Sequence, residues 1–145
     1  MKYLLDASAL LPLVTRRGKH LVVEASHETL ITTDLAIYEA CNSLWKLVTL
    51  LKSISLEEAL DVAVTLKDLA IRAIIRPMDF SKIDISNTLM KACKEMLTFY
   101  DASYIASAQS TDAILVTEDE KLQKVAKKFV KTITYKDLER RIAHS

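Results

Sequence analysis

Short apolar runs alternate with helical segments along this chain, and this alternation limits the possible folds more than any other feature. The runs with the length and composition of buried strands are residues 2–5, 30–33, 74–78, 113–117 and 130–134. Between them apolar residues recur at helical spacing, as from Asp34, a predicted N-cap, to about Leu51. Strands that alternate with helices predict a parallel sheet with right-handed crossovers. We therefore expect an α/β fold in which a central parallel β-sheet of about five strands is flanked by helices.

Size, charge and cysteine usage narrow the class further. The chain has 145 residues, half of them hydrophobic, which fits one domain over residues 1–145. Its 20 basic and 19 acidic residues nearly cancel, so no global charge favours or excludes a nucleic-acid partner. No apolar stretch reaches ~18 residues and no basic segment precedes the first strand, so we expect a cytoplasmic protein. The two cysteines, Cys41 and Cys93, form no CxxC pair and are predicted to be free thiols in the core.

Four carboxylates stand where a strand ends or a helix is entered: Asp6, Glu39, Asp101 and Asp119. The carboxyl ends of parallel strands open on one edge of a sheet, so acids that are distant in sequence can converge there. Carboxylate oxygens suit Mg²⁺ or Mn²⁺. Such ions can activate a water for in-line attack on a phosphodiester, and no protein nucleophile is then needed. The single glycine, Gly18, rules out a glycine-rich phosphate loop.

Each of these acids also has a purely structural explanation. Aspartate is favoured at helix N-termini, so Asp6, Asp101 and Asp119 are equally explained as helix caps. Glu39 begins a polar stripe of the kind found on solvated helix faces, together with Asn42, Ser43 and Lys46. Spacing alone leaves both interpretations open.

Four segments together resemble the PIN-domain family, and most closely the VapC-type toxin ribonucleases. They are YLLDAS at 3–8, YEACN at 38–42, YDASY at 100–104 and LVTEDEKL at 115–122. Their order and spacing fit over essentially the whole chain, and the combination is more specific than any one segment. The resemblance implies a PIN-like fold with an acidic pocket that binds Mg²⁺ or Mn²⁺. The implied activity is that of a metal-dependent endoribonuclease that hydrolyses RNA by metal-activated water.

The resemblance also assigns roles to individual residues. Asp6 and Asp101 match the principal metal ligands, Glu39 the acid on a helix, and Asp119 the acid after the late strand. Supporting positions fall on Ser8 and Thr117, which match hydroxyl positions, and on Asn42, which lies one turn after Glu39 and is otherwise a solvated amide. Two further acids, Glu118 and Glu120, flank Asp119, and we expect them to complement the positive end of the following helix.

Partners are implied by the same resemblance and by one apolar segment. The family's toxins belong to type II toxin–antitoxin pairs, usually form homodimers and bind an antitoxin protein. The segment from Leu44 to Leu60 is apolar on more than one side, as expected of a protein interface. Tyr100 and Tyr104 are candidates either for stacking on RNA bases or for core packing. The alternatives are a PIN nuclease of RNA processing without an antitoxin, and a non-catalytic PIN-like scaffold that binds RNA or protein.

Overall fold

The centre of the molecule is a five-stranded parallel sheet with the strand order β3-β2-β1-β4-β5, seen in a computed structural model that describes residues 1–143. The strands are β1 (Lys2–Leu5), β2 (Thr29–Thr33), β3 (Ile75–Met78), β4 (Ile114–Val116) and β5 (Thr132–Ile133). All neighbouring strands pair in parallel. This confirms the predicted fold class. Strand β3, which contains Pro77, is an edge strand, where proline is tolerated.

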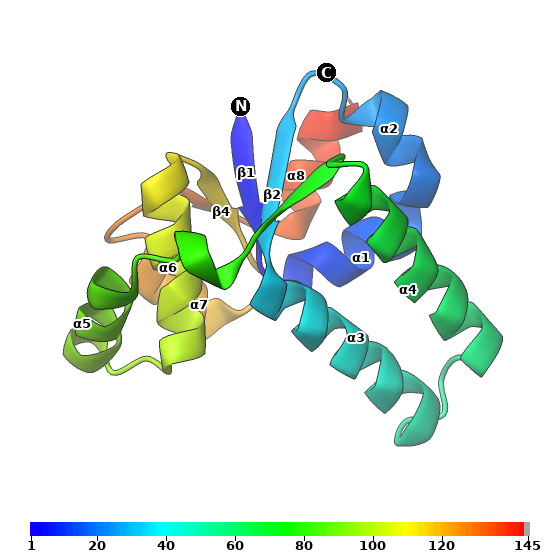
Figure 1. The fold of residues 1–145 in the computed structure, drawn as a ribbon, viewed down its shortest axis with the longest axis horizontal. Coiled ribbons are helices and arrows are strands. Elements are labelled where there is room, and N and C mark those ends of the chain that lie inside the picture. Colours follow the sequence, from blue (N-terminus) through cyan, green and yellow to red (C-terminus); the bar gives the residue numbers. More distant parts are fainter. Residues whose placement is uncertain (144–145) are drawn as a thin grey trace.

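Helices cover both faces of this sheet (Figure 1). One face carries α1 (Ala7–Arg17), α4 (Leu56–Ile71) and α8 (Tyr135–Ala143). The other carries α5 (Ile85–Glu95), α6 (Phe99–Thr111) and α7 (Glu120–Ala126). The long helix α3 (Asp34–Thr49) runs beside α4, and the two extend away from the sheet as a helical arm (Figure 1). Three short segments complete the structure: η1 (Gly18–His20), α2 (Leu21–Glu24) and η2 (Phe80–Lys82).

Local chemistry sets several helix boundaries. The backbone N–H of Gly18 ends α1 by donating to the carbonyl of Val14, at a positive φ of 48° that favours glycine. A capping box opens α4, in which Ser55 and Glu58 exchange hydrogen bonds of 3.1 Å.

Threonine hydroxyls, rather than the aspartates expected from the sequence, cap two helices near the sheet edge. Thr33 accepts from the N–H of Ala36 at 3.1 Å and begins α3, so the prediction of Asp34 as N-cap was wrong. Thr98 accepts from the N–H of Asp101 at 3.1 Å and begins α6. Asp101 therefore lies in the first turn of α6 and does not cap it.

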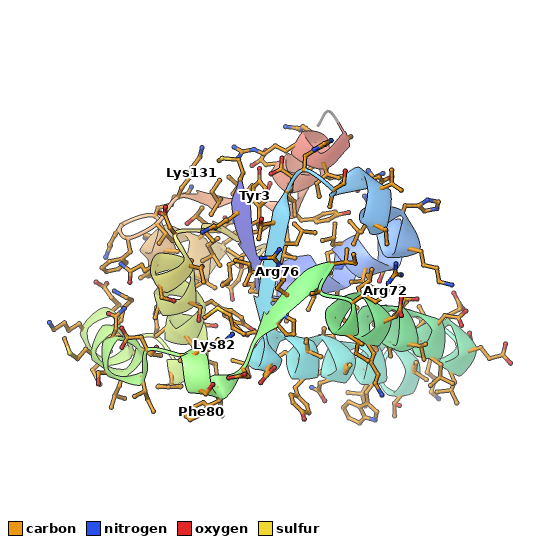
Figure 2. The ribbon with its side chains drawn as sticks, turned by 45° about the horizontal axis from the view of Figure 1, so that its top comes forward. Tyr3, Arg72, Arg76, Phe80, Lys82 and Lys131 are labelled. Carbon is orange, nitrogen blue, oxygen red and sulfur yellow. The ribbon has the colours of Figure 1, made fainter. Side chains whose placement is uncertain are left out.

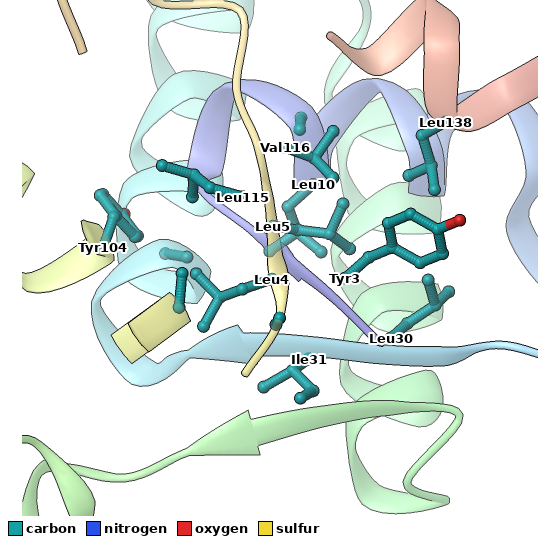
Figure 3. Packing of buried hydrophobic residues seen from close by; sticks show 14 of the residues in the cluster. Tyr3, Leu4, Leu5, Leu10, Leu30, Ile31, Tyr104, Leu115, Val116 and Leu138 are labelled. Carbon is teal, nitrogen blue, oxygen red and sulfur yellow. The ribbon is translucent and has the colours of Figure 1, made fainter. Parts of the chain in front are cut away.

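The core joins the sheet to the helices on both faces (Figure 3). Leu4, Leu5 and Leu115 from the central strands are completely buried, as are Leu10 of α1 and Ile105 of α6. Each buried leucine or isoleucine stabilises the fold by roughly 1.5–3 kcal/mol. This packing holds the carboxyl ends of β1 and β4 in place relative to α1 and α6.

Two further expectations concern the surface. Cys41 and Cys93 are free, but both are exposed, so their predicted place in the core was wrong. Cys41 lies next to the polar stripe of α3, on the part of the helix that turns away from the sheet. Across residues 1–143, no helix combines the length and apolar character that crossing a bilayer requires.

Candidate active site in an acidic cavity

A cavity of about 540 Å³ opens at the carboxyl edge of the sheet, and all four predicted acids line it. Asp6 directly follows β1, Asp119 follows β4, and Asp101 lies in the first turn of α6. Glu39 lies on α3, which follows β2. Four elements that are distant in sequence thus bring their carboxylates to one cavity, as expected for this edge of a parallel sheet.

Asp6 is the most buried of the four acids, with 4% of its surface exposed. Its Oδ1 accepts from the backbone N–H of Ala9 at 3.0 Å, which caps α1, and from the hydroxyl of Ser8 at 2.6 Å. Its Oδ2 accepts from the hydroxyl of Thr117. These three donors hold the carboxylate in a single orientation at the end of β1.

Two hydroxyl side chains join the end of β1 to the end of β4. The hydroxyl of Thr117 donates to Asp6 and accepts from the backbone N–H of Asp119 at 3.1 Å. The hydroxyl of Ser8 donates to Asp6 and accepts from the backbone N–H of Glu118 at 2.8 Å. Ser8 lines the cavity, whereas Thr117 lies behind Asp6 and is completely buried. Both predicted supporting hydroxyls therefore contact a predicted ligand.

Two of the acids, Asp119 and Asp6, both cap a helix and line the cavity. Asp119 caps α7 by accepting from the N–H of Leu122 at 3.1 Å through Oδ1. Among the hydrogen bonds of residues 1–143, none uses its Oδ2. Asp6 likewise caps α1 and lines the cavity. For Asp101 the capping explanation fails because Thr98 occupies that position.

Glu39 has a partner that the sequence did not indicate. The phenol of Tyr104 donates to Oε1 of Glu39 at 2.5 Å, across the cavity from α6 to α3. Tyr104 is 3% exposed, so it is not available to stack on a base, whereas Tyr100 is 60% exposed. Burial and the hydrogen bond to Glu39 both raise the pKa of Tyr104. Nothing in the sequence around Tyr104, four residues after Tyr100, predicted this contact with Glu39.

Glu118 and Glu120, the acids that flank Asp119, lie outside the lining of the cavity. Glu118 turns away and its Oε1 accepts from the backbone N–H of Tyr135 at 2.5 Å, at the start of α8. It was expected to complement α7, and that assignment was wrong because the chain folds α8 against this turn. Glu120 lies in the first turn of α7, as expected, but outside the cavity. Asp119 is the acid of this segment that lines the cavity.

The electrostatics show that the carboxylates influence one another. Burial raises the pKa of Asp6 to about 6, the hydrogen bonds from Ser8 and Thr117 oppose the rise, and the charge of Asp119 adds to it. Burial also raises the pKa of Asp101, with further contributions from Asp119 and Glu39 and opposition from Lys121. The carboxylates repel one another, and a cation bound between them would reduce this repulsion.

The donors in this cavity suit a hard cation. They are carboxylates, hydroxyls and the amide of Asn42, with no histidine or cysteine. As the side chains stand, no three His, Cys, Asp or Glu residues within 1–143 are arranged as ligands of one ion. A cation held here would complete its coordination shell with water, which is common for Mg²⁺.

Three polar side chains of α3 line the cavity although the sequence did not predict it: Tyr38, Ser43 and Lys46, the last two having been explained as part of a solvated stripe. Tyr38, Asn42 and Lys46 follow each other at four-residue spacing on α3, so one helix face carries them all. This spacing was visible in the sequence, although only the fold shows that the face is turned toward the cavity.

The fold and the cavity define a small α/β protein with an acidic site at the carboxyl edge of a parallel sheet. The chain belongs to the PIN-domain family, whose model, described as PIN domain, matches residues 3–128. This confirms the resemblance drawn from the four sequence segments.

A sequence match and a structural match both come from Pyrobaculum aerophilum. The chain is 35% identical over 128 residues to a protein named Exonuclease VapC9, with 84% of each chain covered. It is 30% identical to PAE2754, whose crystal structure superposes with a TM-score of 0.76, covering 100% of this chain and 91% of that one. The structure of VapBC-1 from nontypeable Haemophilus influenzae has 15% identity and a TM-score of 0.60, covering 94% and 99%. That last likeness is one of fold.

Proposed function

We propose that this chain is a metal-dependent ribonuclease and the toxin of a type II toxin–antitoxin pair, built as one PIN domain over residues 1–145. The observation that carries this proposal is the meeting of four carboxylates, from four separate elements, in one cavity. A relative named as an exonuclease of VapC type, 35% identical, supports nuclease activity. The likeness to a VapBC structure is consistent with an antitoxin partner.

The residues that line the cavity have different roles in the proposed reaction. Asp6, Asp101, Asp119 and Glu39 would hold Mg²⁺ or Mn²⁺, which when bound supplies Lewis-acid chemistry for phosphodiester hydrolysis. Ser8 and Thr117 fix the orientation of Asp6 by donating to its two oxygens. Tyr104 fixes Glu39 in the same way. Asn42, which lines the cavity, and Lys46 at its far end are placed to contact the substrate's phosphates.

A second part of the proposal is whether the protein cuts RNA internally or from a strand end. The sequence resemblance favours an endoribonuclease, while the name of the 35% identical relative is that of an exonuclease. The cavity is open to solvent, which suits the passage of a continuous strand through it. We therefore propose internal cutting.

A single assay tests the activity and its mode. Single-stranded RNA of mixed sequence, labelled at the 5′ or the 3′ end, is incubated with the protein in Mn²⁺, Mg²⁺ or EDTA. Internal cutting produces discrete fragments with either label, whereas an exonuclease shortens the chain progressively from one end. We expect discrete fragments that depend on the metal. Undiminished cutting in EDTA would contradict the metal, and RNA binding without cutting would favour the scaffold alternative.

Matched aspartate variants test the site. Asp101→Asn is expected to abolish cutting, and Asp112→Asn at the opposite end of the same helix is expected to leave it unchanged. Asp119→Asn separates catalysis from capping, because asparagine caps almost as well as aspartate. Its control is Asp84→Asn, which caps α5 through a similar bond of 3.0 Å outside the cavity. Full activity in Asp101→Asn or Asp119→Asn would remove that residue from the site.

The antitoxin and a second copy of the chain need apolar surface, and the arm formed by α3 and α4 provides it. Exposed side chains of the arm, which we call the arm surface, are Trp45, Leu50, Leu51, Leu56, Leu60 and Val64. Trp45 is 51% exposed, so it does not complete the core. An exposed apolar patch of this kind is typical of a protein interface. We propose that the arm surface binds the antitoxin, and co-purification with the product of the adjacent gene tests this.

A further inference from the structure

A second, smaller cavity borders the acidic one. It has a volume of about 250 Å³ and lies between the start of α3, the segment after β3 and the first turns of α6. Its wall is mainly apolar and aromatic, with Leu35, Met78, Phe80, Ile83, Phe99 and Tyr100. Thr33, Asp34 and Ser103 complete the lining, which is almost wholly apolar. In both chemistry and size this cavity differs from the acidic one.

The two cavities share the same two helices. On α6, Tyr100 lines the apolar cavity and the next residue, Asp101, lines the acidic one. On α3, Leu35 and Glu39 are one turn apart and line the apolar and the acidic cavity respectively. An RNA strand with a phosphodiester at the carboxylates would therefore have an adjacent nucleotide beside the apolar cavity.

Two aromatic rings stand at the entrance of the apolar cavity and face solvent. Phe80 is 67% exposed and Tyr100 is 60% exposed. Exposed aromatic rings beside a pocket provide flat surfaces on which unstacked bases bind. Figure 2 shows Phe80 and Lys82 together on η2, the short segment that follows β3. The exposed Lys82 thus adds a positive charge close to where the strand's phosphates would lie.

We propose that this apolar cavity binds one unstacked nucleobase of the RNA strand whose phosphodiester is cut in the acidic cavity. The inference rests on the proposed ribonuclease function and assigns a base-binding subsite to it. Phe80 and Tyr100 stack on the base. The apolar wall of the cavity surrounds the rest of the base.

A base fits these features better than a second protein does. The cavity is concave, is lined by the same two helices as the site of chemistry and has two exposed aromatic rings in its lining. The neighbouring exposed side chains of α5, such as Leu89 and Met90, lie outside its lining and are a separate surface. A protein interface at this place would use both sets, so the two occupants can be told apart by experiment.

Kinetics on defined substrates test the subsite. The full chain is assayed in Mn²⁺ on single-stranded RNA oligonucleotides that differ in one base next to the cut bond. Phe80→Ala and Tyr100→Ala are expected to lower kcat/KM roughly tenfold each through KM, because loss of one stacking contact has about this effect. Tyr100→Phe retains the ring and is expected to behave as wild type. Met90→Ala is the control for the neighbouring surface.

The outcomes separate this inference from the proposed function. Wild-type kcat/KM and wild-type base preference in both alanine variants would overturn the base subsite while leaving the ribonuclease intact. A change in mass by light scattering, without a change in KM, would also overturn it and would assign these rings to a protein interface. If the folded wild type neither cuts nor binds RNA, the proposed function itself fails and the subsite fails with it.

Discussion

Replacing Asp6 by asparagine is expected to make the metal-free protein more stable, while destroying the site. The pKa of this buried carboxyl is raised from its ordinary value of 3.8 to about 6, chiefly by burial. That rise corresponds to a cost of about 3 kcal/mol for holding the charged form in the folded protein above pH 6. Asparagine carries no charge and therefore avoids this cost.

The hydrogen bonds of Asp6 offset part of the gain. Asparagine retains an oxygen that accepts from the N–H of Ala9 and the hydroxyl of Ser8. Its amide group replaces the oxygen that accepts from Thr117, so that hydroxyl must accept where it now donates. Rearranging one hydrogen bond costs about 1 kcal/mol. We therefore expect a net gain of about 1–2 kcal/mol at pH 8.

The pH dependence gives this prediction its sign. Because the folded pKa of Asp6 lies above the unfolded one, the wild type recovers stability relative to the variant as the pH falls from above 6 toward 3.8. The asparagine variant should thus be more stable at pH 8, and this advantage should disappear near pH 4. A metal that binds the folded site stabilises the wild type and should do so much less in the variant.

Urea unfolding in EDTA at a series of pH values measures these differences. The control is Asp84→Asn, a cap of α5 at an exposed position, which should change stability by less than ~1 kcal/mol. An Asp6→Asn variant that is less stable than the wild type at pH 8, or a difference that does not vary with pH, would refute the reasoning. Repeating the series with Mn²⁺ tests the metal.

Three other substitutions examine the neighbours of the site and the arm surface. Tyr104→Phe removes the hydroxyl that holds Glu39, and we expect kcat to fall roughly fivefold to tenfold with KM unchanged. A normal kcat would mean that Tyr104 contributes only to packing. Thr117→Val leaves Oδ2 of Asp6 and the N–H of Asp119 without a partner, so it should lower the free energy of unfolding by about 1–3 kcal/mol, whereas Thr117→Ser should not. Trp45→Ala should change the free energy of unfolding by no more than ~1 kcal/mol, because Trp45 is exposed. It should weaken antitoxin binding or self-association by about 2 kcal/mol, measured by titration and light scattering. Unchanged affinity and mass would count against the arm surface.

Local patterns were enough to predict most of the secondary structure. Each strand is a short apolar run and each long helix shows its spacing within about a dozen residues, so both are visible without the fold. The capping box of Ser55 and Glu58 is local in the same way, because its bonds span only three residues. For Asp101 the sequence left capping and metal binding open, and the structure removes the first because Thr98, which is equally able to cap, stands three residues earlier.

The chemistry of the site was only partly contained in the sequence. The motifs predicted which acids belong together, and all four do line one cavity. Only the tertiary structure decided that Tyr104 holds Glu39, that Thr117 holds Asp6, and that Glu118 turns away to α8. The first two of these contacts join residues 65 and 111 positions apart. No local pattern encodes such contacts, because they arise when the packing of strands and helices brings distant side chains to the same edge of the sheet.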